Sequence, residues 1–215
     1  RCASATEAEA AGKILAREVR AMAAVTHPNV VMLLGVCLDP ANLAIVMQYA
    51  EKGTLRDRLA EHTPARPFEA WRRFDLLLGV LNGIRCLHAH TPRPIVHADL
   101  KSLNVLVCVD NESGAWVAKI TDFGLASGSG LSTTAGTRAG GSGGGTLTHN
   151  APEILNGERQ TTASDVYAFG MVAWEAADGG IPFESMQAGV VLSSILMGKR
   201  PALPAKPPPG SVFSD

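Results

Sequence analysis

Hydrophobic and polar positions near the start of the chain predict a helix followed by two strands. Apolar residues recur at steps of three and four from Ala8 to Val25, which is the spacing of one buried helix face, and His27-Pro28-Asn29 ends that pattern. Two apolar runs with strand-like composition follow, from Val30 to Leu38 and from Leu43 to Tyr49. The turn-forming residues between them, Asp39-Pro40-Ala41-Asn42, predict that these strands pair as a hairpin.

The middle of the chain predicts two helices and a second pair of strands. Thr54, followed by Asp57 three residues later, has nearly the sequence of a capping box and predicts the start of a short helix. A longer helix is expected from Trp71 to His88. Its buried stripe is expected at four apolar positions, which are Phe74, Leu77, Leu81 and Ile84. Short strands are expected at Val105–Val109 and Trp116–Ile120, because a polar turn separates these two apolar runs.

The last part of the chain combines a polar segment with further helices. Residues 127–148 are dominated by Gly, Ser and Thr and are too poor in apolar groups to pack, so we expect a mobile segment there. Helices are predicted from Ser164 to Ala177 and near Ser185 to Met197. A proline-rich end follows from Pro201 to Pro209.

Composition places the chain among globular proteins. Its 215 residues, 46% of them hydrophobic, suffice for one large domain or two small ones with a buried core. The 19 basic and 20 acidic side chains give a net charge of -1, which argues against nucleic acid or an anionic membrane as the main partner. No apolar run approaches the roughly 20 residues that cross a bilayer, and no charged-then-apolar leader opens the chain.

The cysteines and the first residue add two expectations. Cys2, Cys37, Cys86 and Cys108 lie far apart, which favours reduced thiols over a zinc site or a disulfide framework. We therefore expect an intracellular, cytoplasmic location. Because the chain begins with Arg1 rather than Met, we expect it to be a piece of a longer protein.

Polar side chains suited to one chemistry gather in two predicted loops. Asp99, Lys101 and Asn104 lie in the first loop, and Asp122 directly follows a predicted strand. Phosphoryl transfer needs a positioned oxygen nucleophile and neutralisation of phosphate charge through magnesium. Asp99 suits the acceptor of a hydroxyl proton, and Lys101 places a positive charge beside a transferred phosphate. Asn104 and Asp122 offer the oxygen ligands that magnesium prefers.

The order of three motifs resembles that of protein kinases. His-Ala-Asp-Leu-Lys-Ser-Leu-Asn at 97–104 precedes Asp-Phe-Gly at 122–124 and Ala-Pro-Glu at 151–153, which is the order of the kinase signature set. Asp-Phe-Gly alone is weak evidence, since a simple turn has the same composition, but the combination is specific. From about Glu7 to Leu203 the chain resembles eukaryotic protein kinases, closest to the tyrosine-kinase-like (Raf-like and mixed-lineage-like) group of serine/threonine kinases.

This resemblance implies a fold and a division of the chain. The fold would be α+β and bilobal, as in protein kinases. Residues 1–50 would form a partial, small, β-rich N-lobe with the C helix and a hairpin. Residues 51–203 would form the mainly α-helical C-lobe without its last helices, with the activation segment at 122–153 and helices reaching residue 198. Residues 204–215 would form a proline-rich tail, and the domain would be truncated at both ends.

The resemblance also implies an activity, cofactors and site residues. The activity would be that of a serine/threonine kinase that uses ATP and Mg²⁺ to phosphorylate protein substrates, since Lys101 and Thr146 are typical of such kinases. Asp99, Lys101, Asn104 and Asp122 would be catalytic, the last two also as metal ligands. The matching nucleotide-site residues are Glu18 of the C helix, the gatekeeper Met47, Gln48 and Ala50, whose backbone would face adenine, and Leu106, which would underlie the base.

Two further sets of residues match structural positions of the family. Asp165 would support the catalytic loop from below, and as an isolated feature it would be only an acidic residue near a helix N-terminus. The second set is a stacked column that links the two lobes and consists of Met22, Leu33, His97 and Phe123.

Two departures from the family pattern leave alternatives open. Ala98 stands where many kinases have an arginine, which predicts that phosphorylation of the activation segment matters less. No glycine-rich loop and no Val-Ala-Ile-Lys strand precede Glu18, and Lys13 lies about 140° away around the same helix, so it faces elsewhere. The alternatives are a pseudokinase or scaffold without turnover and a small-molecule phosphotransferase with a related fold.

Overall fold

The computed structural model describes residue 16 and residues 18–39, 42–63, 68–123 and 147–203. A helical stretch covers residues 18–23. The strands are β1 (Leu33–Cys37), β2 (Ala44–Met47), β3 (Val105–Val109) and β4 (Trp116–Ile120). The α-helices are α2 (Leu55–Ala60), α3 (Ala70–His88), α4 (Pro152–Leu155), α5 (Thr162–Asp178) and α6 (Ala188–Leu196). Two short 3₁₀ helices are η1 (Ser102–Asn104) and η2 (Leu147–His149).

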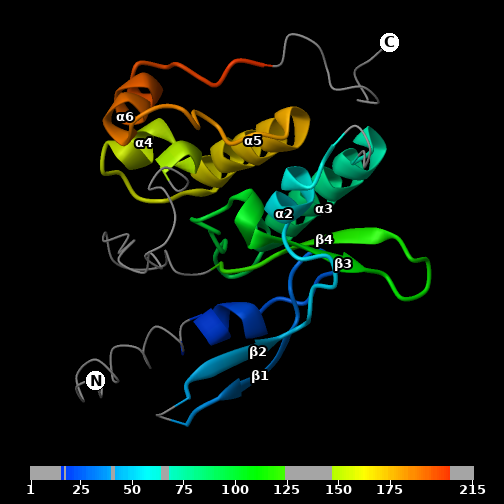
Figure 1. Ribbon diagram of the computed structural model, residues 1–215. Helices are drawn as coiled ribbons and strands as arrows, with labels where there is room; N and C mark the ends of the chain where they lie inside the picture. The colour runs from blue at the N-terminus through cyan, green and yellow to red at the C-terminus, as the bar shows by residue number, and fades with distance from the viewer. Residues whose placement is uncertain (1–15, 17, 40–41, 64–67, 124–146, 204–215) are drawn as a thin grey trace.

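The elements form an α+β arrangement of two unequal parts. Residues 18–23 and the β1–β2 hairpin lie together at one end, and α3, α4, α5 and α6 lie at the other (Figure 1). The β3–β4 hairpin lies between these parts and packs on α3 (Figure 1). Each sheet is a two-stranded antiparallel pair, as the two predicted hairpins require.

The predicted strand from Val30 to Leu38 divides between two partners. Only its second half, β1, pairs with β2, and the ladder is irregular between Leu33 and Gly35. Val30 instead forms a parallel bridge with Ile120, and the Val31 N–H donates to the Ile120 carbonyl at 3.0 Å. The first two residues of this run therefore join the small part of the molecule to β4.

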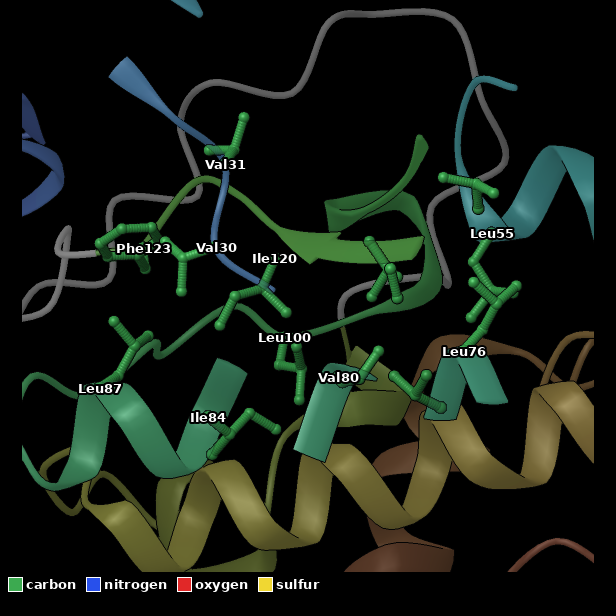
Figure 2. Close-up of a cluster of buried hydrophobic side chains, with 14 of the residues drawn as sticks. Val30, Val31, Leu55, Leu76, Val80, Ile84, Leu87, Leu100, Ile120 and Phe123 are labelled. Carbon is green, nitrogen blue, oxygen red and sulfur yellow. The ribbon is translucent and has the colours of Figure 1, made fainter. Parts of the chain in front are cut away.

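The buried stripe of α3 differs from the predicted one. Phe74 and Leu81 are 48% and 45% exposed, Leu77 is half-buried, and only Ile84 of the predicted four is fully buried. The apolar residues that α3 buries are Leu76, Val80, Ile84 and Leu87 (Figure 2). Both sets repeat at helical spacing, so periodicity alone does not choose between them.

Close backbone approach decides which face of α3 is buried. A Cβ atom on Gly83 would lie 2.6 Å from the carbonyl oxygen of Asn29 and 3.1 Å from Ile120 side-chain carbons. Gly79 is similarly close to Asn29 and Ala118. Because only glycine leaves room for this approach, the face that carries these two residues lies against β4.

Helix starts follow the predicted local rules. Thr54 caps α2, and the Asp57 side chain returns a hydrogen bond to the Thr54 backbone, which confirms the capping box. The predicted helix from Ser164 to Ala177 is confirmed as α5, which Thr161 caps with Ser164. The last predicted helix is confirmed as α6, although it begins only at Ala188.

Several predictions fall partly or wholly outside the described residues. These include the helix from Ala8 as far as residue 15, Lys13, most of the segment predicted to be mobile, and the proline-rich end beyond residue 203. At residues 147 and 148 the mobile-segment prediction is wrong, because Leu147 begins η2 and Thr148 is only 2% exposed. None of the helices in the described ranges is long and apolar enough to span a membrane.

Candidate active site

The loop that carries Asp99 is held from below by Asp165, near the start of α5. The backbone N–H groups of His97 and Ala98 donate to the two oxygens of the Asp165 carboxylate at 2.8 and 2.9 Å. His88 Nε2, at the end of α3, lies 2.7 Å from Asp165 Oδ2. Ala98 has a left-handed backbone with φ of 68°. A buried carboxylate with several donors therefore fixes the start of this loop.

Asp99, Lys101 and Asn104 converge on one carboxylate. Lys101 Nζ lies 2.8 Å from Asp99 Oδ2, and Asn104 Nδ2 lies 3.1 Å from the same oxygen. Asn104 Nδ2 also donates to the Asp99 backbone carbonyl at 2.8 Å. The Asp99 side chain is 35% exposed, whereas the Lys101 side chain is 18% exposed. The carboxylate is thus oriented by two donors and still open to a reactant.

Asn104 joins this loop to the strand that precedes Asp122. It ends η1, and its backbone carbonyl accepts a hydrogen bond from the Thr121 N–H at 3.0 Å. Its Nδ2 makes both side-chain hydrogen bonds given for this residue, and Oδ1 has no partner among the described residues. The amide oxygen is therefore available to a cation or another donor.

Asp122 lies just after β4 and faces a second acidic group. Its backbone is left-handed, with φ of 59°, and Thr121 Oγ1 lies 3.4 Å from Asp122 Oδ1. Burial and the negative charge of Asp122 raise the pKa of the Glu18 carboxyl. Among the described residues, no lysine or arginine pairs with Glu18 or Asp122. This arrangement leaves an excess of negative charge that favours a bound cation.

The residues predicted to contact a nucleotide base lie around β2 and β3. Thr121 Oγ1 lies 3.7 Å from Met47 Sδ, so the end of β2 lies beside the residue that precedes Asp122. The Gln48 N–H donates a hydrogen bond to the Met32 carbonyl at 2.9 Å, and the Ala50 carbonyl accepts one from the Gly53 N–H. Half-buried Leu106 is bridged to Thr54. The Gln48 carbonyl and the Ala50 N–H have no hydrogen-bond partner in the described ranges.

The predicted column of Met22, Leu33, His97 and Phe123 lies in the core between the two parts. Met22, His97 and Phe123 are buried, and Leu33 packs against the same cluster while remaining half-buried. The His97 and Phe123 rings are 6.2 Å apart between centroids. Burial lowers the pKa of His97, although the charges of Asp165, Asp99 and Asp122 oppose this effect.

Sequence reasoning missed a buried polar cluster beneath the catalytic loop. His149 Nε2 lies 3.2 Å from Glu175 Oε2, and Arg56 Nη1 lies 3.5 Å from Glu175 Oε1. The three residues come from η2, α5 and α2. The three residues lie far apart along the chain, so no local pattern indicates the cluster. The presence of Glu175 within the apolar run from Ala168 to Ala177 was nevertheless a usable signal.

Metal ligands are sparse in the part of the chain that the structure describes. No group of three or more His, Cys, Asp or Glu side chains is placed to hold a metal ion there. A cation at Asn104 and Asp122 would therefore take its other oxygen ligands from water or from a ligand, as is usual for Mg²⁺ beside phosphates.

Comparison with known proteins identifies the family. The family model described as protein tyrosine and serine/threonine kinase matches residues 2–210. Mouse mitogen-activated protein kinase kinase kinase 10 is 37% identical over 187 residues, which cover 85% of this chain and 19% of the mouse protein. The Arabidopsis thaliana serine/threonine-protein kinase CTR1 is 35% identical over 179 residues, covering 83% of this chain and 21% of CTR1.

A third relative extends the comparison to Dictyostelium discoideum. Its probable serine/threonine-protein kinase pats1 is 38% identical over 198 residues, which cover 87% of this chain and 6% of that protein. The chain thus spans only 19%, 21% and 6% of the lengths of these three relatives. The family match nevertheless covers most of the chain, which therefore belongs to the protein tyrosine and serine/threonine kinase family, with relatives in its tyrosine-kinase-like serine/threonine group.

Proposed function

We propose that the protein containing this chain is a serine/threonine kinase that transfers the γ-phosphate of ATP to protein hydroxyl groups. The observation that carries the proposal is the convergence of Lys101 Nζ and Asn104 Nδ2 on Asp99 Oδ2, at 2.8 and 3.1 Å. An oriented, partly exposed carboxylate beside an ammonium group is what transfer to a hydroxyl requires.

In this proposal Asp99 acts on the acceptor hydroxyl. Its carboxylate would orient the Ser or Thr O–H and take the proton as the hydroxyl oxygen forms a bond to the γ-phosphorus of ATP. The bond from that phosphorus to the β–γ bridging oxygen breaks at the same time, and ADP leaves. Lys101 holds the carboxylate through its ion pair and places a positive charge near the transferred phosphoryl group. Asn104 restricts the loop through its bonds to Asp99. Positioning and electrostatics, rather than covalent catalysis, would account for most of the rate.

The residues present also fit magnesium. Asn104 Oδ1 is unpaired among the described residues, and Asp122 and Glu18 carry uncompensated negative charge near each other. We assign Asn104 and Asp122 as the ligands of Mg²⁺, with Glu18 as a neighbouring acidic group of the nucleotide site. When bound, Mg²⁺ neutralises charge on the phosphate oxygens.

The adenine end of the nucleotide would lie at the segment after β2. The Gln48 carbonyl and the Ala50 N–H supply one acceptor and one donor without a partner among the described residues. Met47 would border the base and Leu106 would lie beneath it. On this basis we divide the chain as expected from its sequence, into a partial N-lobe at 1–50, a C-lobe at 51–203 and a tail at 204–215.

A phosphorylation assay of the full-length protein tests this function. Asp99→Asn and Asp122→Asn are each expected to lower Mg-ATP-dependent phosphorylation of a generic protein substrate at least about 100-fold. Asp110→Asn is the matched control. This exposed aspartate lies in the turn between β3 and β4, where its Oδ1 accepts a hydrogen bond from the Ser113 N–H. Phosphoamino-acid analysis should detect phosphoserine and phosphothreonine.

The same assay distinguishes the scaffold alternative. Equal incorporation by wild type, Asp99→Asn and Asp122→Asn would exclude catalysis by this site. Absence of turnover in a folded, full-length protein that still binds nucleotide or partner proteins would support the scaffold instead.

A further inference from the structure

A surface pocket lies between the start of α3 and the turn that joins β3 to β4. Its volume is about 300 Å³, at the lower end of the range for ligand pockets. The lining residues come from both elements and are Trp71, Arg72, Asp75, residues 113–115 and Trp116. Trp116 begins β4, whereas Asp122 follows the other end of this strand. The pocket therefore lies away from the residues of the proposed transfer step.

Arg72 holds the two tryptophan rings of the pocket in place. Its guanidinium carbon lies 4.7 Å from the centroid of the Trp71 ring and 4.9 Å from that of the Trp116 ring. Arg72 Nε also pairs with Glu69 Oε2 at 3.1 Å. A planar guanidinium stacks on aromatic faces, and the pairing with Glu69 restricts its rotation. The two rings, one from α3 and one from β4, therefore form a preorganised aromatic surface.

The polar groups beside these rings are donors without acceptors. Trp174 Nε1 donates to the Ala202 carbonyl at 2.9 Å. In contrast, the Nε1 groups of Trp71 and Trp116 have no hydrogen-bond partner among the described residues. The two Nη atoms of Arg72 are likewise unpaired within the described ranges. Because Trp71 is also 56% exposed, a fitting ligand must combine an apolar face with free hydrogen-bond acceptors.

A polyproline II segment has this combination of groups. Its pyrrolidine rings offer apolar faces, and its backbone carbonyls make no internal hydrogen bonds, so they remain free acceptors. Proline-rich segments dock in aromatic-lined grooves in this way, at a low entropic cost. A helical peptide fits less well, because its carbonyls are paired within the helix and would leave the pocket donors unsatisfied. The aromatic surface thus favours a proline-rich ligand.

Charge at the rim of the pocket adds a second requirement. Asp75 is exposed and forms no ion pair or hydrogen bond with any described residue. Lys52 Nζ lies 5.9 Å from the centroid of the Trp116 ring, so positive charge is found beside that ring. The charge of Arg72 is offset by Glu69. A basic ligand residue is therefore expected at Asp75, whereas an anionic ligand would meet an uncompensated carboxylate.

We propose that this pocket docks a proline-rich segment of a partner protein, in which a lysine or arginine beside the prolines pairs with Asp75. The prolines pack on the rings of Trp71 and Trp116, while the indole N–H groups and Arg72 donate to peptide carbonyls. The pocket shares no lining residue with the catalytic loop, so docking should not require ATP. This interaction surface goes beyond the proposed kinase function and does not depend on it.

Fluorescence anisotropy with the full-length protein tests the docking surface. The probe is a labelled peptide of sequence Ala-Pro-Pro-Ala-Pro-Pro-Lys-Lys, measured without ATP. Trp71→Ala should weaken its binding at least about tenfold, as truncation of a central tryptophan predicts. The matched control is Phe74→Ala, because Phe74 is 48% exposed on the same helix and does not line the pocket. Equal binding by wild type and Trp71→Ala, or an equal loss in the control, would overturn the proposal.

Two altered peptides test the chemistry of the ligand. Asp75→Asn should weaken binding of the original peptide about two- to fivefold, as loss of an exposed ion pair predicts. It should not change the binding of a peptide in which both lysines are glutamine, and an equal effect on both peptides would overturn the pairing. A peptide in which alanine replaces every proline should bind at least about tenfold more weakly. Equal affinity for this peptide would overturn the polyproline II assignment.

Intrinsic fluorescence supplies a readout without any variant, should Trp71→Ala fail to fold. The pocket holds two of the three tryptophans of the chain, so saturating peptide should shift their emission to shorter wavelength as Trp71 is covered. Unchanged emission would overturn the proposal.

Replacing the prolines at 207–209 by alanine tests the proline-rich end of the chain itself as the occupant. A partner segment predicts that this variant binds the peptide as the wild type does. Tighter binding by the variant would show that the pocket is occupied by the chain's own segment, and it would overturn the assignment to a partner protein.

Discussion

The Asp165 carboxylate accepts a hydrogen bond from the Ala98 N–H at 2.9 Å and thereby supports the residue immediately before Asp99. The same carboxylate accepts from the His97 N–H at 2.8 Å. Helix α5 thus holds the catalytic loop through backbone groups, and the short side chain of Ala98 does not affect this support. The departure from the family pattern at Ala98 leaves the loop's attachment intact.

Removing this carboxylate should weaken both stability and transfer. Asp165→Ala removes the acceptor of the buried His97 N–H and of the part-buried Ala98 N–H, which is expected to lower the free energy of unfolding by about 2 to 4 kcal/mol. Urea denaturation measures this loss, and kcat should fall while the KM for ATP stays constant. The control is Asp178→Ala, whose carboxylate accepts, among the described residues, only from the Gly180 N–H at the surface, with an expected change of about 0.5 kcal/mol or less. Equal losses in the two variants would contradict the support role.

A methyl group at Gly83 should destabilise the protein. The added Cβ would lie 2.6 Å from the Asn29 carbonyl oxygen, so α3 must move from β4, at a cost of about 1 to 3 kcal/mol. In contrast, Gly170→Ala in α5 meets no atom within 4 Å and should stabilise the helix by about 0.5 to 1 kcal/mol. Thermal unfolding of both variants measures this difference in sign. A stable Gly83→Ala would show that α3 does not need this close approach.

Glu18 should make stability decrease as pH rises above the ordinary range of a carboxyl group. Burial and the charge of Asp122 raise its pKa above 4.5, so the folded protein binds this proton more tightly than the unfolded chain does. The favourable contribution is complete below pH about 4.5 and is lost as pH rises through the raised value. Glu18→Gln should therefore increase the free energy of unfolding at pH 7, without added Mg²⁺, more than the exposed Glu184→Gln does. No difference between the two variants at pH 7 would argue against the repulsion.

His97 should make the protein sensitive to mild acid. Burial lowers the pKa of His97 below 6.5, so the unfolded chain takes up this proton before the folded protein does. Stability therefore falls as pH drops below about 6.5, by at most about 1.4 kcal/mol per pH unit from this group. Replacing it in His97→Phe should flatten the stability profile between pH 6.5 and 5, measured by urea denaturation. The variant His90→Phe, at a half-buried histidine outside the core, should retain the wild-type slope.

The local sequence determined the order of elements and the residues of the catalytic loop. The Thr54 cap, the two hairpins and α5 depend on residues within a few positions of one another, and the structure confirms them. The motif that contains Asp99 likewise brought Lys101 and Asn104 close to its carboxylate, because all three lie in one short loop.

Only the tertiary structure decided what depends on contacts between distant segments. Two faces of α3 have helical spacing, and the close approach of Gly83 to Asn29 determines which one is buried. The bond from His149 to Glu175 joins segments whose local patterns are unrelated. Side-chain periodicity reports the conformation of one element, whereas burial and charge pairing depend on its neighbours in space, so these features emerge only when the chain is folded.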